Sequence, residues 1–505
     1  MVTPQPVDGD NPTTDLRDAP NSRPDQDTAQ MKLSYRDAIS QLLSLADFER
    51  KSRAGDPSDF HLKRIERLLG YIGNPHIGQK YVHVAGSKGK GSTSALIAWP
   101  LAASGYKTGL FSSPSIHRIT ERIRINGESI SEGEFARIVE TLWPAIERVT
   151  ADGDIGVVSV FELETAMALH HFTEQGTDIN VIEVGLGGRL DSTNIVTPVV
   201  SVITPISLDH VAVLGDTIGK IAGEKAGIIK QGIPVVSSPQ VPDADTVIRA
   251  TASANNSELI ESHNAVPILN STDHGLDGVE LELGVDGRSL DTRLHLLGTH
   301  QIDNTRTAVA VLRQLINNGM PIDLGAIGEG ISAVKWPARN QLVNRHPNPV
   351  FVDGAHNGAS AKAFRKTVEQ LFPDRGGVVL ILGTVRGHDP SAVARELASL
   401  KPRIVVTESR HPKSLRGTEL AKALSECKIT VSSTTTSTQL ALNHARVLAG
   451  DGDVILATGS LFVAAEIIEI EHGIEPELYP DIKLPSRRSL SPAAQQNWSL
   501  TKTDR

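Results

Sequence analysis

The sequence has little cysteine, no long apolar run and no excess of positive charge. Its 505 residues include one cysteine, Cys427, which excludes an intrachain disulfide and a thiolate metal site. No apolar run reaches the roughly 18 residues that a membrane-spanning helix needs. The formal net charge is −9, whereas nucleic-acid binders need a basic surface to neutralise phosphates. We therefore expect a cytoplasmic protein that binds neither membrane nor nucleic acid.

What the sequence does contain, after about residue 30, is an alternation of apolar segments and amphipathic stretches. Apolar residues at helical spacing predict helices within residues 31–50 and 59–73. The apolar segments that follow are typical of buried strands, and they cover residues 80–86, 107–113, 178–185 and 198–206. This alternation predicts an α/β fold with a mainly parallel sheet.

The pattern restarts after Trp336 and Pro337, which indicates a second domain. Its apolar segments cover residues 349–356, 376–383, 403–409 and 452–460. Residues 237–293 are polar and alternating, which favours a β-rich insertion. Residues 1–30 and 486–505 are rich in polar residues and proline, and we predict disordered tails there.

A glycine-rich segment joins the first apolar strand to the next helix. It comprises Gly86, Ser87, Lys88, Gly89, Lys90, Gly91 and Ser92. Such a turn leaves backbone N–H groups at a helix N-terminus, where the helix dipole favours an anion. Lys90 can reach the outer phosphates of a nucleotide, and Ser92 can meet a phosphate or its Mg²⁺. The spacing is shorter than G-x-x-x-x-G-K-[ST], and a turn that only lets a strand meet a helix is the alternative.

The glycine-rich segment resembles the nucleotide loop of the Mur ligase superfamily, and is closest to the folylpolyglutamate synthase / dihydrofolate synthase family, whose usual form is G-T-N-G-K-G-S. Further segments match that family in order across roughly residues 31–470. They are FSSPSIHRITERIRINGESI, FELETAMALHHF, VIEVGLGGRLDSTNIVTP, SLDHVAVLGDTIGKIAGEKAGIIKQGIP, LLGTHQIDNTRTAVA, WPARNQLV, FVDGAHNG and ATGSLFVAAE.

The resemblance implies a two-domain α/β architecture with the active site between the domains. An N-terminal P-loop ATPase domain would cover residues 31–334, and a smaller C-terminal Rossmann-like domain would cover residues 335–485. The implied reaction uses ATP to convert an acceptor carboxylate into an acyl phosphate, which the amine of L-glutamate attacks. ADP and phosphate would leave as the amide forms.

The resemblance also implies a set of groups around the phosphates. Lys90 would contact the β- and γ-phosphates, Ser113 and Glu162 would bind one Mg²⁺, and His210 would bind a second. Lys225 would be carbamylated, which turns a cation into a carboxylate that can face Mg²⁺. Catalysis would then depend on Lys90, Lys225 and His210. Structural roles are the alternatives: a turn at Ser113, a helix N-terminal acid at Glu162, a hydrogen-bonded histidine at His210 and a surface lysine at Lys225.

The family motifs imply that the segments after residue 295 contact the nucleotide as the domains close. The residues concerned are His300, Gln301, Asn304, Arg339, Asp353 and His356. Asp353 ends an apolar strand, from which a carboxylate can meet a ribose hydroxyl. The run DGAHN is also compatible with a simple turn.

The acceptor side is expected near a second glycine-rich turn. Arg189 and Asp191 lie there, after an apolar strand, and Arg189 suits bidentate carboxylate binding. An ion pair between Arg189 and Asp191 is the alternative. Ser115 stands where the family pattern places a histidine, and we expect it near the acceptor. Ser87 and Lys88 replace the usual Thr-Asn, so Lys88 adds charge near the phosphates.

These features predict an ATP-dependent ligase that adds L-glutamate to a folate, to dihydropteroate or to both. A Mur-type ligase for another carboxylic acid is the alternative enzyme. A regulatory nucleotide-binding protein or switch GTPase is disfavoured, because the sequence has no N-K-x-D motif. By analogy with the family, we expect a monomer.

Overall fold

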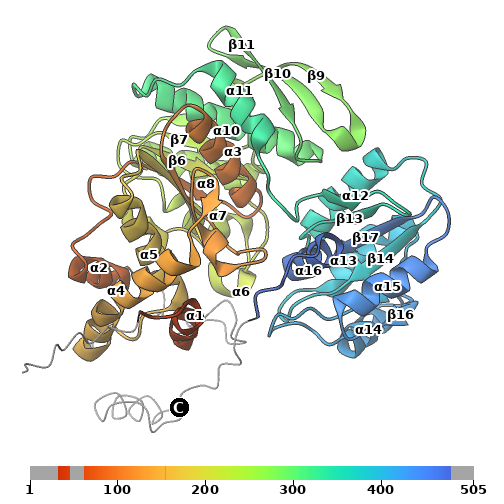
Figure 1. Ribbon diagram of the computed structural model, residues 1–505. Helices are drawn as coiled ribbons and strands as arrows, with labels where there is room; N and C mark the ends of the chain where they lie inside the picture. Colours follow the sequence, from red (N-terminus) through yellow and green to blue (C-terminus); the bar gives the residue numbers. More distant parts are fainter. Residues whose placement is uncertain (1–31, 46–61, 154, 479–505) are drawn as a thin grey trace, which may run out of the picture.

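The computed structural model describes residues 32–45, 62–153 and 155–478, which form two α/β lobes (Figure 1). The predicted tails at residues 1–30 and 486–505 lie outside the described residues. We call residues 32–333 the N-terminal lobe and residues 338–478, which begin with Ala338 packed on the second sheet, the C-terminal lobe. None of the described helices is both long and apolar enough to span a membrane.

An eight-stranded sheet forms the centre of the N-terminal lobe, with strand order β4-β3-β2-β5-β1-β6-β7-β8. Its strands are β1 (Tyr81–Ala85), β2 (Thr108–Phe111), β3 (Ile123–Ile125), β4 (Glu128–Ser129), β5 (Ile179–Glu183), β6 (Val200–Ile203), β7 (Val235–Ser237) and β8 (Leu259–Glu261). The six strands from β2 to β8 in this order are parallel, and β3 and β4 add an antiparallel edge. All residues of β1, β2, β5 and β6 are buried, as expected for parallel strands covered on both faces.

Helices cover both faces of this sheet. They are α1 (Tyr35–Ser44), α2 (Lys63–Tyr71), α3 (Lys90–Ala103), α4 (Glu132–Asp152), α5 (Val160–Glu174), α6 (Val211–Leu214), α7 (Ile218–Ala226), α8 (Pro242–Ala254), α9 (Ser262–Ala265), α10 (Thr299–Asn317) and α11 (Leu324–Ala333). Val82 and Val84 of β1 pack with α3 and α10 on one face. Tyr81, on the opposite face, packs with α4 and α5.

The prediction of a β-rich insertion at residues 237–293 is correct only for its second half. Residues 242–254 form helix α8, which begins with Pro242 in its first turn and continues through alanine-rich sequence. The antiparallel sheet starts later and comprises β9 (Ile268–Asp273), β10 (Val279–Val285) and β11 (Arg288–Leu294). Strand β9 is exposed along its whole length, so its sequence lacks the apolar alternation that would have separated it from the helix before it.

A six-stranded sheet forms the C-terminal lobe, with strand order β12-β13-β17-β14-β15-β16. Its strands are β12 (Gln341–Asn344), β13 (Val350–Val352), β14 (Val378–Leu382), β15 (Arg403–Val406), β16 (Ser433–Thr434) and β17 (Val454–Thr458). Its helices are α12 (Gly358–Leu371), α13 (Pro390–Leu397), α14 (Gly417–Glu426), α15 (Thr438–Leu448) and α16 (Leu461–His472). Helix α11 ends the first lobe and β12 begins the second sheet, so we propose a domain boundary within residues 334–340.

Candidate active site

The phosphate loop lies where β1 ends and α3 begins, and two of its glycines are required by close contacts. A Cβ atom on Gly86 would lie 1.8 Å from Oγ1 of Thr204, and one on Gly89 would lie 2.5 Å from Oδ1 of Asn304. Gly89 is also in the left-handed region, with φ of 83°. The loop therefore packs directly against β6 and α10, and a side chain at either glycine would displace it.

Only part of the loop can offer its amides to an anion. The N–H groups of Ser87 and Lys88 both donate to the carbonyl of Pro205, at 3.0 and 3.1 Å. The first backbone bond into α3 runs from Thr93 to Gly89, so the amides of residues 90–92 point out of the helix N-terminus. The amides of Lys90, Gly91 and Ser92, unlike those of Ser87 and Lys88, are thus available to an anion.

Lys90 faces a buried carboxylate from the neighbouring strand. Its Nζ atom lies 3.9 Å from Oε1 of Glu183, the last residue of β5. The backbone N–H of Ser113 donates to the other oxygen of Glu183 at 3.3 Å. Burial raises the pKa of Glu183 to about 7, against the opposing effect of Lys90. This carboxylate is therefore short of positive charge, and a cation placed beside it would be stabilised.

The expected metal ligand Glu162 is engaged elsewhere. Its carboxylate accepts hydrogen bonds from Nε of Arg64, at 2.8 and 3.0 Å, and from the N–H and hydroxyl of Ser159, at 2.7 and 2.8 Å. It thus closes the capping box of α5 and forms a buried ion pair. The structure does not support Glu162 as a ligand, and Glu183 is the acid beside the loop. Glu183 is not among the predicted site residues, although it ends a buried strand next to β1, where sites in α/β folds form.

Lys225 and His210 lie on the segment that follows β6. Lys225 is 3% exposed, in the last turn of α7. Burial, with the charge of Lys90 adding to it, lowers the pKa of Lys225 to about 7. His210 precedes α6 in the left-handed conformation, and its side chain is half exposed. Lys225 therefore offers a buried amine with a pKa of about 7, and His210 offers an accessible imidazole, both beside the phosphate loop.

The three residues expected at the acceptor have different surroundings. Asp191 is buried and accepts hydrogen bonds from Leu186 N–H and from the N–H and hydroxyl of Thr193. Its carboxylate therefore holds a turn together and is not directed at a ligand. Arg189 pairs with Glu224 at 2.8 Å and not with Asp191, and its side chain is exposed. Ser115 is half-buried in the loop after Ser113.

Helix α10 brings amide side chains to the phosphate loop. The side chain of Gln301 donates to the hydroxyl of Ser92 at 3.4 Å and accepts from Asn304 at 2.8 Å. His300 is half-buried at the start of the helix, and burial lowers its pKa. Gln301 and Asn304, which the family motifs predict to contact the nucleotide, thus lie beside the phosphate loop.

The C-terminal lobe contributes Arg339, Asp353 and His356. Asp353 follows β13 and accepts a hydrogen bond from Asn340 N–H at 2.9 Å. Burial raises the pKa of Asp353, and the charge of Arg339 opposes this rise. Burial lowers the pKa of Arg339, whereas Asp353 and Glu183 favour its charged form. Arg339 thus lies within electrostatic reach of both lobes.

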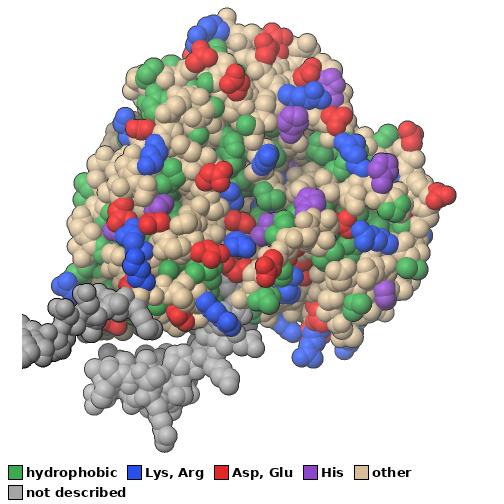
Figure 2. Space-filling model, in the orientation of Figure 1, with side chains coloured by type: hydrophobic (Ala, Val, Ile, Leu, Met, Phe, Trp, Pro, Cys, Tyr) green, Lys and Arg blue, Asp and Glu red, His purple; other side chains and the backbone are tan. Residues whose placement is uncertain are grey.

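Lys88 connects the phosphate loop to the C-terminal lobe. Its Nζ atom donates to Asp209 at 2.8 Å and lies 3.2 Å from Nε2 of His356. Figure 2 shows a hollow between the two lobes, with charged and histidine side chains along it. A cavity of about 580 Å³ at this boundary is lined by both lobes.

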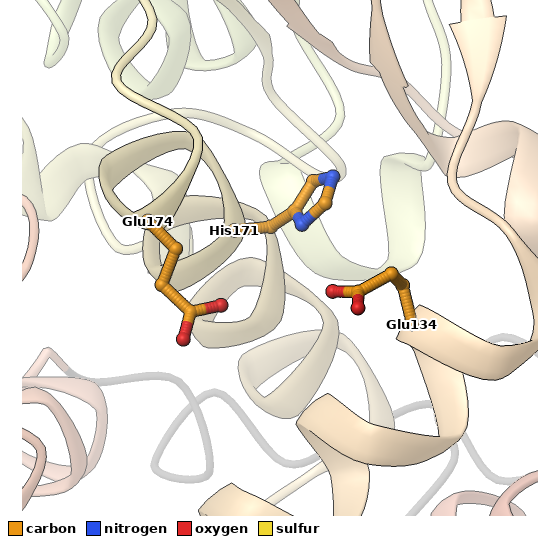
Figure 3. Close-up of side chains that lie close together, drawn as sticks. All are labelled: Glu134, His171 and Glu174. Atoms are coloured by element: carbon orange, nitrogen blue, oxygen red, sulfur yellow. The ribbon is translucent and has the colours of Figure 1, made fainter.

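A second group of polar side chains lies elsewhere in the N-terminal lobe (Figure 3). Glu134 of α4 and His171 and Glu174 of α5 present potential metal-ligand atoms within 4.8 Å of one another. The guanidinium group of Arg137 already donates to both carboxylates, at 2.9 Å to Glu134. His171 and Glu174 also end the helix that leads into the start of β5, opposite the sheet edge that carries the phosphate loop. We therefore assign this group a structural role as an ion-pair network.

The phosphate loop, the facing C-terminal lobe and the charged groups between them define a ligase of the Mur type. Residues 150–312 match the Mur ligase middle domain, and residues 338–461 match the Mur ligase glutamate ligase domain. The dihydrofolate synthase/folylpolyglutamate synthase of Bacillus subtilis (strain 168) is 33% identical over 442 residues, which cover 86% of this chain and 99% of that protein.

Solved structures agree with this relationship. Mycobacterium tuberculosis folylpolyglutamate synthase complexed with ADP has a TM-score of 0.79 and 30% identity, and covers 88% of this chain and 100% of its own. A folylpolyglutamate synthase complex with AMPPCP and folate has a TM-score of 0.73 and 30% identity, with coverages of 88% and 100%. The chain belongs to the folylpolyglutamate synthase / dihydrofolate synthase family.

Proposed function

We propose that this protein is an ATP-dependent ligase that adds L-glutamate to a folate, to dihydropteroate or to both. The observation that carries the proposal is the convergence of Lys90, Ser113 and Glu183 at a phosphate loop that faces a second lobe. Relatives along almost the full length of the chain are named for these activities. The family's complexes with nucleotide and folate support the same pair of ligands.

The reaction has two steps, each of which needs a different group positioned. In the first, an oxygen of the acceptor carboxylate attacks the γ-phosphorus of ATP, and ADP leaves. In the second, the glutamate amine attacks the acyl carbon, phosphate leaves and the amine loses a proton. Positioning and charge neutralisation supply most of the acceleration in phosphoryl transfer.

The residues beside the phosphate loop fit a hard divalent cation. Glu183 offers a carboxylate whose pKa is raised by burial, so that a bound cation would favour its charged form, and Ser113 and His210 offer an oxygen and a nitrogen. We assign Glu183, Ser113 and His210 to hold Mg²⁺ with the nucleotide. When bound there, Mg²⁺ supplies positive charge to the phosphate oxygens. We further propose that Lys225 is carbamylated, since it is buried and its pKa is near neutrality.

The remaining residues divide between nucleotide and acceptor. Lys90 and the amides of Gly91 and Ser92 bind the phosphates, while Gln301 and Asn304 fix the shape of the loop. Arg339, Asp353 and His356 complete the site from the C-terminal lobe. Arg189 is the accessible cation on the acceptor side, whereas Asp191 maintains the turn that carries it.

The test uses purified protein with Mg-ATP and L-glutamate. Dihydropteroate is added to one sample and tetrahydrofolate to another, and products are identified by mass. Glutamate addition to dihydropteroate alone indicates a dihydrofolate synthase, addition to tetrahydrofolate alone a folylpolyglutamate synthase, and addition to both a bifunctional enzyme. No product in either sample, with intact nucleotide binding, would contradict the proposal and indicate a ligase for another acid.

A further inference from the structure

The contact made by Lys88 selects one tautomer of His356 in the C-terminal lobe. Nδ1 of His356 lies 3.0 Å from the carbonyl oxygen of Gly354, which can only accept. Nδ1 therefore carries the proton, and Nε2 presents a lone pair. The Lys88 ammonium, 3.2 Å away, has donors and no acceptor, so it donates to Nε2. His356 is thus held in one tautomer, with its ring stacked on that of His388 at 4.8 Å between centroids.

The same ammonium group neutralises an aspartate from a third segment. Asp209 lies between β6 and α6, and its carboxylate is 2.8 Å from Nζ of Lys88. The Lys88 ammonium group favours the charged form of this carboxylate by direct contact. Hydrogen bonds between charged groups are about twice as strong as neutral ones. One lysine therefore joins the phosphate loop, the β6–α6 segment and the C-terminal lobe.

The boundary beside this contact is not fully closed. The cavity of about 580 Å³ is lined by mostly apolar residues of the N-terminal lobe, together with Ser207 and Asp243, and by residues 357–359 at the start of α12. Leu208 and Val241, which line it, are 53% and 47% exposed. Apolar surface is thus available for the lobes to bury if they approach further, and the approach is anchored at Lys88.

We propose that Lys88 is a positioning residue that docks the C-terminal lobe onto the phosphate loop and presents His356 in a single tautomer. The proposal rests on the proposed function, in which ATP binds at the loop and residues of the other lobe, His356 among them, complete the site. Loss of Lys88 would leave the amides of residues 90–92 and Lys90 in place. Loss of Lys88 should therefore slow the catalytic step that needs both lobes, and should weaken nucleotide binding to a smaller extent.

The experiment compares Lys88→Met, which keeps the length of the side chain without its charge, with Lys88→Arg, which keeps the charge. Lys220→Met is the matched control, because Lys220 pairs with Asp216 on the exposed side of α7. Steady-state rates give kcat and each KM, a fluorescent ADP analogue gives the nucleotide dissociation constant, and small-angle scattering with ADP reports how closely the lobes approach.

We expect Lys88→Met to lower kcat by about tenfold to a hundredfold, the effect of losing one charge-assisted hydrogen bond. Its nucleotide dissociation constant should change by less than about threefold on the same scale, and its radius of gyration with ADP should exceed that of the parent. Lys88→Arg should recover most of the activity, and Lys220→Met should match the parent.

The proposal is overturned if Lys88→Met weakens nucleotide binding as much as it lowers kcat/KM while the scattering is unchanged, since Lys88 would then be a phosphate contact only. If Lys88→Met does not fold, Asp209→Asn removes the ion pair from the opposite side, and unchanged scattering for that variant overturns the proposal as well. Failure of the proposed function is a separate result: the parent would form no glutamyl product, whereas the scattering change would persist.

Discussion

The ammonium group of Lys90 lies 3.9 Å from the carboxylate of Glu183. Glu183 is the last residue of β5, and Lys90 begins α3, the helix that follows the neighbouring strand β1. A buried carboxylate and an ammonium group 3.9 Å apart are not hydrogen-bonded to each other. Each can therefore still pair with a ligand, the ammonium group with phosphate and the carboxylate with a cation. The sequence places both residues after apolar strands, but only the order of strands in the sheet brings them together.

Removing either charge should abolish catalysis without unfolding the protein. We expect Lys90→Ala and Glu183→Gln each to lower kcat by at least about a hundredfold, the usual cost of losing one preorganised charge in the transition state. Release of ADP in the presence of both substrates measures this. Glu140→Gln, on the exposed face of α4, is the control and should match the parent. Equal rates for Lys90→Ala and the parent would contradict the phosphate-binding role.

Changing Glu162 to glutamine should distinguish a structural role for Glu162 from the metal-binding role proposed for Glu183. Gln keeps the capping geometry of α5 but removes the negative charge that pairs with Arg64. Breaking a buried pair from one side costs about 3–5 kcal/mol, so we expect a loss of that order in the free energy of unfolding. Urea denaturation measures the loss. The Mg²⁺ concentration that gives half-maximal activity should stay at the parent value, and a large increase would restore Glu162 as a ligand.

Strands and the phosphate loop were predictable because their signals are local. Parallel strands buried on both faces require apolar runs, and a tight loop beside a helix requires glycine. The partners of polar side chains were not predictable in the same way. Arg64 and Glu162 are separated by 98 positions, and Lys88 and His356 by 268, so no local pattern links them. The sequence points to Glu162 rather than Glu183 as the metal ligand for the same reason: both acids stand beside apolar residues, and no local pattern tells them apart.

Asp191 and Lys225 show the same contrast between local features, which the sequence predicts, and roles that depend on distant neighbours. The turn around Asp191 is built by hydrogen bonds to residues within five positions, so its structural role has a local cause. The spacing of Ile221 and Ala222 in the sequence predicts that Lys225 lies near the apolar side of its helix, and the structure confirms its burial. Helical periodicity thus predicts burial well, whereas the purpose of a buried polar group depends on its neighbours.

Lys225 should react reversibly with carbon dioxide. Only the neutral amine can form a carbamate, and a pKa of about 7 makes much of Lys225 neutral at pH 8. We expect a carbamate signal in carbon NMR after addition of labelled bicarbonate, lost in Lys225→Ala. Lys220→Ala should keep the signal, because Lys220 is exposed and paired with Asp216. The same signal in Lys225→Ala and the parent would place the modification elsewhere.

His83 in β1 should make the fold sensitive to mild acid. The Thr193 hydroxyl donates to Asp191, so it accepts from Nε2 of His83 at 2.9 Å, and Nδ1 of His83 is buried without a partner in the described structure. Protonation would bury an unpaired charge, and burial lowers the pKa of His83 to about 3.

Because the pKa of His83 in the folded protein lies below its unfolded value of 6.5, the unfolded chain binds the proton first. The contribution of this residue to stability is complete above pH 6.5 and is lost as the pH falls toward 3, at about 1.4 kcal/mol per pH unit. We expect urea unfolding at pH 7.5 and pH 5 to show a larger loss for the parent than for His83→Gln, whose amide can still donate to Thr193. His295→Gln, at an exposed position, should lose as much as the parent. If His83→Gln and the parent weaken in parallel, acid sensitivity arises from other groups and the neutral buried state of His83 is wrong.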